Sequence, residues 1–233
     1  ANFLNQNEID LFQDRNIAGI YGQADLDFKD FVYLTLAGRN DWVSNFSKDN
    51  RSIFYPSLSL SFIPTSAFDD LHSGTLNYLK IRAGYGTSAN FGDLGYPVAN
   101  TTLINTAATQ NIDGRTIVTN STSQVLGNPD LKPELLREFE VGVESRLWDN
   151  RISVDLSLYK RVTQDLIVNR PLDPATGKTV VRTNVGEVEN QGIEIDLGLS
   201  IFRNQDKGGL NWDTSLNFTA YESEVTDLGL DTD

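Results

Sequence analysis

The sequence predicts an all-β fold: an antiparallel up-and-down meander of approximately eight strands that forms a segment of a large transmembrane β-barrel. Three observations predict it. Apolar and polar residues alternate strictly over eight segments, which is the period of a strand with two different faces. Each segment reaches the length of about 9–11 residues that a tilted strand needs to cross the hydrocarbon of a membrane. The connections alternate between short and long, as they do in membrane barrels.

The hairpin within residues 127–160 shows the two faces most clearly. Val143 and Leu156 belong to its apolar face, and Glu138 and Glu140 belong to its charged face. An apolar face toward lipid and a charged face toward a wet lumen account for both. The other segments repeat this pattern, and in chain order the eight are 17–29, 31–41, 51–63, 76–88, the two halves of this hairpin, 190–202 and 211–221.

The connections place all the long loops at one rim of the meander. The long loops are 42–50, 89–133 and 163–189, and we expect them to be irregular because they are rich in turn-forming residues. The third and fourth segments are joined through one helical turn, where Ser66 stands three residues before Asp69 as in a capping box. The other short connections are Lys29-Asp30, Trp148-Asp149-Asn150 and "RNQDKGGL" (203–210).

Aromatic residues gather at the rim of the short connections, as amphipathic rings do at a membrane–water boundary. The aromatic residues at the short-connection rim are Phe28, Phe31, Phe62, Trp148, Phe202 and Trp212.

The two faces predict different responses to arginine. An arginine on the apolar face, at Leu156 or Val143, is expected to destabilise the protein, whereas the loss of stability from an arginine at Ser157 on the polar face is expected to be mild.

Composition excludes several classes of function. The 233 residues carry a net charge of −13, which argues against nucleic acid and against anionic lipid surfaces as partners. Cysteine is absent and His72 is the single histidine, so thiol chemistry, zinc sites built on His and Cys, and Ser-His-Asp catalysis have no basis. We therefore expect no enzyme, no metal and no cofactor. The chain starts at Ala1, contains no methionine and shows no signal peptide, which fits a mature chain or a piece of a larger one.

Several stretches resemble one family. "GNPDLKPE" (127–134) followed by "LREFEVGVE" resembles the late-barrel stretch of SusC/RagA-type TonB-dependent outer-membrane receptors. The Asn-Pro-Asp-Leu-Lys-Pro-Glu string carries most of this specificity. Three further stretches resemble the same family in the right order: "GRNDWVSNFSKDNRSIFYPSLSLSFIPTSAF" (38–68), "LNYLKIRAGYGTSAN" (76–90) and "VGEVENQGIEIDLG" (185–198).

The resemblance implies a function. Residues 1–233 would be part of one TonB-dependent receptor β-barrel domain, with no plug domain in this chain. Such receptors have about 22 strands and a plugged lumen. The family implies import of oligosaccharides or peptides across the outer membrane of a Gram-negative, Bacteroidota-like bacterium. A SusD-like surface lipoprotein would be the partner, and TonB would supply energy through parts of the protein outside this chain.

Strand parity and depth predict which residues face the cargo in the upper lumen. Tyrosine offers a flat stacking face with a hydroxyl, and an arginine–carboxylate pair offers directional polar contacts. A barrel interior is polar whether or not anything binds, so the alternative that a given residue only lines the solvated wall remains open for each of them. The predicted substrate-binding residues are Tyr21, Arg39, Asp41, Tyr55, Tyr159, Arg161, Glu194 and Tyr221.

Two other functions remain open. One is a stand-alone eight-stranded outer-membrane barrel with a structural or adhesive role, since eight strands are the smallest closed membrane barrel. The other is a soluble, acidic all-β binding module. Pairing of the first strand with the eighth would favour the small barrel, although a small barrel fills its interior with side chains. Inward Gly84, Gly86, Gly142 and Gly198 leave room instead, which favours an arc of a larger barrel.

Overall fold

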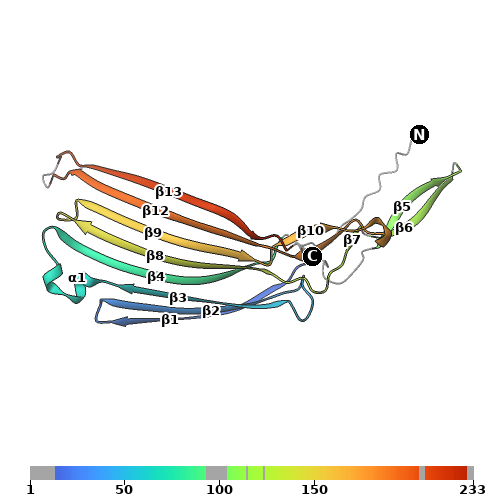
Figure 1. The fold of residues 1–233 in the computed structure, drawn as a ribbon, viewed down its shortest axis with the longest axis horizontal. Helices are drawn as coiled ribbons and strands as arrows, with labels where there is room; N and C mark the ends of the chain where they lie inside the picture. Colours follow the sequence, from blue (N-terminus) through green and yellow to red (C-terminus); the bar gives the residue numbers. More distant parts are fainter. Residues whose placement is uncertain (1–13, 93–103, 114, 123, 205–207, 230–233) are drawn as a thin grey trace.

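The computed structural model describes residues 14–92, 104–113, 115–122, 124–204 and 208–229. Its main feature is one antiparallel sheet in the order β1-β2-β3-β4-β8-β9-β12-β13, with neighbours in space also neighbours along the meander (Figure 1). The sheet consists of β1 (Ile17–Phe28), β2 (Val32–Val43), β3 (Ser52–Phe62), β4 (Leu76–Asn90), β8 (Glu134–Leu147), β9 (Ile152–Gln164), β12 (Glu187–Phe202) and β13 (Trp212–Asp227). The predicted fold class and strand order are confirmed.

The sheet has two chemically different faces. One register row across all eight strands is entirely apolar, and it consists of Leu26, Leu34, Leu60, Ala83, Val141, Leu158, Ile193 and Ala220. The adjacent row points to the opposite face, because side chains alternate along a strand. That polar face, as we name it, carries Asp25, Thr35, Ser59, Gly84, Glu140, Tyr159, Gly192 and Tyr221 in this row.

The apolar face is uncovered. In the described part of the chain only four hydrophobic residues are buried, namely Val43, Phe46, Ile63 and Leu131. Long apolar side chains on the strands stay exposed instead, such as Phe54 at 62%. A β-sandwich would bury one such face against a second sheet. The sheet therefore needs an apolar surrounding that the described residues do not supply.

The sheet is also open. β1 pairs only with β2 and β13 pairs only with β12 among the described residues, so the eight strands form an arc and not a closed barrel. No helix in the described ranges is long and apolar enough to cross a membrane.

Tight turns join the strands at one rim. Lys29 and Asp30 both have positive φ, 52° and 58°, and the N–H of Phe31 donates to the carbonyl of Phe28. Positive φ at both central residues defines the type I′ turn, whose twist suits a hairpin. Trp148, Asp149 and Asn150 also have positive φ in the second predicted turn. Residues 205–207 of the third turn lie outside the described residues.

The aromatic residues at this rim touch one another, with Phe31 edge to face on Phe28 and Phe62, and with Phe202 and Trp212 tilted at 35°. The ring centroids of Phe31 lie 5.5 Å from Phe28 and 6.2 Å from Phe62, and those of Phe202 and Trp212 lie 6.1 Å apart. Such pairs stabilise by about 0.5–1.5 kcal/mol beyond their burial. The predicted concentration of aromatic residues at the strand ends of the short-turn rim is confirmed.

The opposite rim holds short strands that the sequence analysis missed. Figure 1 shows them at the far end from α1. The long loops were expected to be irregular, and this expectation was wrong for 89–133 and 163–189. Two of the pairs are local hairpins, β5 with β6 and β10 with β11, whereas β7 pairs in parallel with β11 across a long sequence separation. These strands are β5 (Ile104–Ile112) paired with β6 (Arg115–Thr122), and β10 (Ile167–Pro171), β11 (Val180–Asn184) and β7 (Val125–Leu126) in a second small sheet, beside the 3₁₀ turn Pro174–Thr176.

The helical turn between β3 and β4 starts earlier than predicted. α1 (Pro64–Ala67) begins at Pro64, whose fixed φ and missing N–H suit a first helical position. Its N-cap is Ile63 and makes no side-chain hydrogen bond, so the predicted Ser66–Asp69 capping box was wrong. Asp69 belongs instead to a separate 3₁₀ turn, Asp69–Leu71.

A small core holds the long-loop rim together. Leu131 and Val43 are fully buried, Phe46 is nearly so, and Phe91 and Ile167 pack against them. These residues come from four separate parts of the chain. Leu131 belongs to the Asn-Pro-Asp-Leu-Lys-Pro-Glu stretch, so this stretch enters β8 through a buried anchor.

Pro56 ends the pairing of β3 with β4. The register runs only from Phe62 opposite Ile81 to Ser57 opposite Gly86. Proline has no N–H to continue a ladder. The carbonyl of Pro56 instead accepts a hydrogen bond of 2.9 Å from the hydroxyl of Thr87. Above this point β4 continues along β8 alone, and the polar face there is hollowed.

Candidate functional site

The polar face holds two groups of predicted binding residues and a structural network between them. The first group lies on β1, β2 and β3. The Nε of Arg39 donates to both carboxylate oxygens of Asp41, at 3.0 and 3.1 Å, and the hydroxyl of Tyr55 donates to the same carboxylate. Arg39 is opposite both Tyr21 and Tyr55 in the strand register. Four of the predicted residues therefore come together, through three neighbouring strands.

The second group lies on β8, β9 and the last two strands. The Nε of Arg161 donates to Glu138 at 2.6 Å, and its guanidinium lies 5.6 Å from the ring centroid of Tyr159. Tyr159 and Tyr221 line one hollow, with Gly192 between them in the register. The hydroxyl of Tyr159 lies where a Cβ on Gly192 would come within 2.6 Å, so the missing side chain makes room for the ring.

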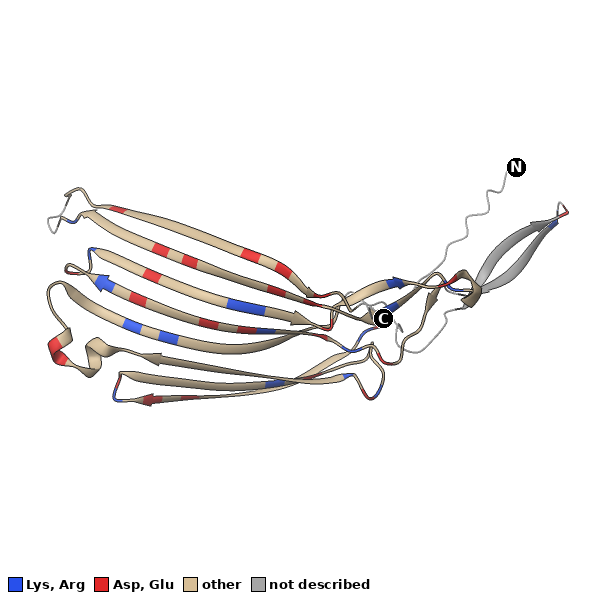
Figure 2. Cartoon of the chain, in the orientation of Figure 1, with Lys and Arg blue, Asp and Glu red and all other residues tan. Residues whose placement is uncertain are grey.

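Glu194 stands apart from both groups. Its neighbours in the register are Ser157 and Thr219, and neither is a predicted binding residue. Figure 2 shows acidic and no basic residues on β12 and β13, whereas basic residues lie on β2, β4, β8 and β9. The wall is thus increasingly negative toward its last two strands.

Arg82 forms a network that the sequence analysis did not single out. Its Nη1 and Nη2 donate to the two oxygens of Asp155 at 3.1 and 2.7 Å, its Nη2 also donates to Ser157 at 2.5 Å, and its Nε donates to Glu140 at 3.3 Å. A Cβ on Gly142 would lie 2.6 Å from this guanidinium. All three side-chain nitrogens donate hydrogen bonds, so Arg82 links β4, β8 and β9 and has a structural role.

Ser157 is therefore a poor site for an arginine. Its side chain lies inside the Arg82 network and is 8% exposed. The burial of Ser157 speaks against the mild effect expected there, because strand parity reports the face of a residue and not the crowding around it. Of the inward glycines, Gly142 and Gly198 give room to neighbouring side chains, and only Gly84 and Gly86 leave open space.

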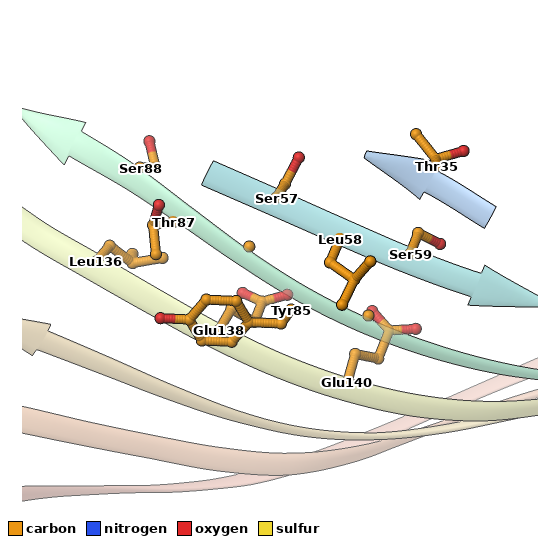
Figure 3. Close-up of a pocket in the computed structure, with 12 residues that line it drawn as sticks. Thr35, Ser57, Leu58, Ser59, Tyr85, Thr87, Ser88, Leu136, Glu138 and Glu140 are labelled. Carbon is orange, nitrogen blue, oxygen red and sulfur yellow. The ribbon is translucent and has the colours of Figure 1, made fainter. Parts of the chain in front are cut away.

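That open space is a central hollow between the two groups (Figure 3). Ser57 and Ser59 point to one side of β3 and Leu58 points to the other (Figure 3). On the polar face the hollow is lined by small residues and, on the β8 side, by two carboxylates and a leucine. These residues are Thr35, Ser57, Ser59, Gly84, Gly86, Ser88, Leu136, Glu138 and Glu140. The signal for it in the sequence is the coincidence of alternating serines in β3 with alternating glycines in β4.

The arrangement suits the binding of a polar ligand. In the described part of the chain no three His, Asp, Glu or Cys side chains are placed to hold a metal ion. The carboxylates nearest to the hollow already accept hydrogen bonds from arginines. What remains available on the face is tyrosine rings, hydroxyls and arginine N–H groups, which are groups that hold a polar ligand.

The comparison with known families decides the class. The β-barrel model of the TonB-dependent receptor-like family matches residues 3–233. The chain belongs to this family. TonB-dependent receptors are outer-membrane proteins and not enzymes, so the polar face is the lumen face of a barrel wall and the apolar face is its lipid face.

Relatives and solved structures agree with this assignment. The chain is 31% identical to TonB-dependent receptor P26 of Formosa agariphila over 91% of its length, and 28% identical to TonB-dependent receptor SusC of Bacteroides thetaiotaomicron, also over 91%. It spans 21% of each of these relatives. The structure of the RagAB peptide importer in its closed-closed state matches 92% of this chain and 23% of that chain, with a TM-score of 0.79 and 27% identity.

Proposed function

We propose that this chain forms part of the wall of an outer-membrane receptor that imports oligosaccharides or peptides. The observation that carries the proposal is a pair of neighbouring register rows, one apolar and one polar, that run across all eight strands. None of the described residues covers the apolar row. Lipid on one side and a hydrated passage on the other satisfy both rows. A soluble module would leave the apolar row in water, and a small closed barrel would need β1 to pair with β13.

The remainder of the receptor completes the transport machinery. Residues 1–233 belong, in this proposal, to one barrel domain that continues on both sides of the arc. TonB acts through parts of the protein outside this chain. The bacterium is Gram-negative and Bacteroidota-like, which agrees with the sources of the two curated relatives described above.

A SusD-like surface lipoprotein is the proposed partner, and it contacts the long-loop rim. The length of the loops 89–133 and 163–189, their common rim and the likeness to SusC support this. Deleting most of 91–125, with Phe91 kept because it packs against the small core, should weaken co-purification of the lipoprotein. The receptor should still assemble, because the buried anchor Leu131 also lies outside the deletion. Undiminished co-purification at equal surface expression would refute the partner contact.

Import itself is tested by growth. A strain that lacks the complete receptor should lose growth on one oligosaccharide or peptide mixture as sole nutrient, and the intact gene should restore it. A strain that grows normally on every such source would refute the import function. The loop-deletion result does not depend on this outcome, because co-purification is measured without uptake.

A further inference from the structure

The arginine of the first group presents its free end to the lumen. Its bonds to Asp41 both leave from Nε. The Tyr55 hydroxyl also lies within hydrogen-bonding reach of the guanidinium. A guanidinium carries five N–H donors, so donors on Nη1 and Nη2 remain for a further acceptor. The Arg39 side chain is 49% exposed and the Asp41 side chain 3%. The buried Asp41 carboxylate therefore orients the Arg39 side chain, and the guanidinium is exposed on the polar face.

Two neighbours fix this arrangement. The hydroxyl of Tyr55 donates to Asp41 and occupies its second oxygen. Gly19 lies opposite Asp41 on β1, and a Cβ there would overlap the Asp41 carboxylate and lie 3.1 Å from Nη2 of Arg39. The missing side chain at Gly19 therefore allows both groups to lie across β1.

The hollow in front of Arg39 has a composition suited to a planar anion. Tyr21 and Tyr55 line it together with Arg39, while Ala37 and Ser57 are small and leave space. Among the described residues Arg39 is the one charged group that lines this hollow, because Asp41 is buried behind it. The central hollow differs, since Glu138 and Glu140 line it and repel an anion.

The other lumen arginines do not offer the same site. All three side-chain nitrogens of Arg82 already donate to Glu140, Asp155 or Ser157. Arg161 lies on Glu138, a carboxylate that also lines the central hollow, so its charge is balanced at the surface itself. Arg146 donates to Glu144 at 3.2 Å and lies 5.0 Å from the ring centroid of Tyr78, near the short-turn end of β8 and away from both hollows.

We propose that Arg39, with Tyr21 and Tyr55 beside it, forms a subsite that binds a carboxylate group of the cargo. The parallel N–H groups of a guanidinium match the two oxygens of a carboxylate. The proposal rests on the proposed import function, and it adds that the cargo is acidic. A peptide carboxyl terminus and a uronic acid carry the same group, and the test separates them.

The test measures binding to the complete receptor, purified in detergent, by titration calorimetry. Two matched pairs of probes are used. The first is an alanine-rich octapeptide with a free carboxyl terminus and the same peptide as its carboxyl-terminal amide. The second is tetragalacturonate and its fully methyl-esterified form. We expect the acidic member of at least one pair to bind about tenfold more tightly, the factor typical of one hydrogen bond to a charged group.

Variants locate the preference. Arg39→Gln should abolish it, whereas Arg137→Gln, which makes the same change of charge at the upper end of the lipid face, should preserve it. Gly19→Ala should weaken the preference with no change of charge, because the added Cβ displaces the Asp41 anchor. A preference within the peptide pair alone assigns the carboxylate to peptides, and one within the sugar pair alone assigns it to acidic glycans.

Two results overturn the subsite: no preference within either pair, or a preference that persists in Arg39→Gln. Both differ from a failure of the import function. Binding in detergent needs neither the lipoprotein nor TonB, so a receptor that imports nothing can still show or lack the carboxylate preference.

Discussion

Glycines on the lumen face illustrate how single residues shape this wall. Gly142 lies beneath the guanidinium of Arg82, whereas Gly84 has no atom closer than 3.9 Å to its Cβ position. Both residues are glycines on the lumen face, but they differ in which side chains lie over them. Gly142 is explained by the Arg82 side chain that crosses over it from the neighbouring strand, and not by backbone strain.

The first prediction concerns Gly142→Ala. The added Cβ would displace Arg82 from Asp155, and losing hydrogen bonds to a charged group costs roughly 1.5–3 kcal/mol. We expect the free energy of unfolding of the complete receptor in lipid vesicles, measured by urea titration, to fall by about that amount. Gly84→Ala is the matched control and should change it little.

A double-mutant cycle separates this cause from a general intolerance of alanine. In an Arg82→Ala background the guanidinium is gone, so Gly142→Ala should have almost no further effect. An undiminished effect in that background would mean that the Arg82 crossing is not the reason for the glycine.

The Asn-Pro-Asp-Leu-Lys-Pro-Glu element acts as a clamp on the long-loop rim. The side-chain amide of Asn184 accepts from the N–H of Lys132 at 2.8 Å and donates to the carbonyls of Lys132 and Asp165, both at 2.7 Å. Glu134 accepts from the N–H of Ile167 at 2.8 Å and from Asn90 at 2.6 Å. The entry to β8 thus holds two other segments in place.

Asn128 completes the clamp. Its side-chain oxygen accepts from the N–H of Asp130 at 3.0 Å, which forms the turn, and its side-chain nitrogen donates to the carbonyl of Arg182 at 2.8 Å. A short asparagine side chain that closes its own turn is a common turn device. The family-like wording of this stretch therefore has a local structural reason.

The second prediction concerns Asn184→Ala. It removes two hydrogen bonds that join β11 to Lys132 at the entry of β8 and a third to the carbonyl of Asp165, so the segment 165–184 should open locally. Amide hydrogen exchange of this segment should speed up, while exchange in the central strands stays unchanged. Asn169→Ala on exposed β10 is the control and should leave exchange as it is. Uniformly faster exchange across the sheet would contradict a local clamp.

The whole molecule is an arc whose stability depends on its surroundings. Leu60 and Ser59 are adjacent in β3 at the same depth, and they point to the lipid face and the lumen face respectively. The membrane assignment depends on the exposed apolar rows of the sheet. Substitutions at Leu60 and Ser59 therefore test it directly, because the two residues sample the two faces.

The third prediction concerns Leu60→Arg. An arginine costs roughly 2–4 kcal/mol at the bilayer midplane and less toward the interfaces. Leu60 lies on the lipid face two residues before the end of β3, so we expect the free energy of unfolding in lipid vesicles to fall by about 1–2 kcal/mol. Ser59→Arg should have a much smaller effect, because its side chain enters a hydrated hollow. Equal losses at both positions would remove the membrane assignment.

Alternation of residue type along the chain was enough to determine the all-β class, the eight strands, their order and their two faces. These follow from the two-residue period of a strand, which is a local property. Type I′ turn positions such as Lys29-Asp30 and the aromatic rim are local as well. Parity also placed Arg39, Asp41 and Tyr55 on one face, although their use by cargo stays a prediction.

Only the tertiary structure decided which side chains meet. Arg82 reaches Asp155 across two strand boundaries, and Leu131 is buried by residues from distant loops. Ser157 is crowded for the same reason. The small sheet of the long-loop rim depends on β7 and β11, which lie more than fifty residues apart. Such contacts depend on lateral register and loop closure, which no local pattern encodes, so they became visible only when the strands were paired.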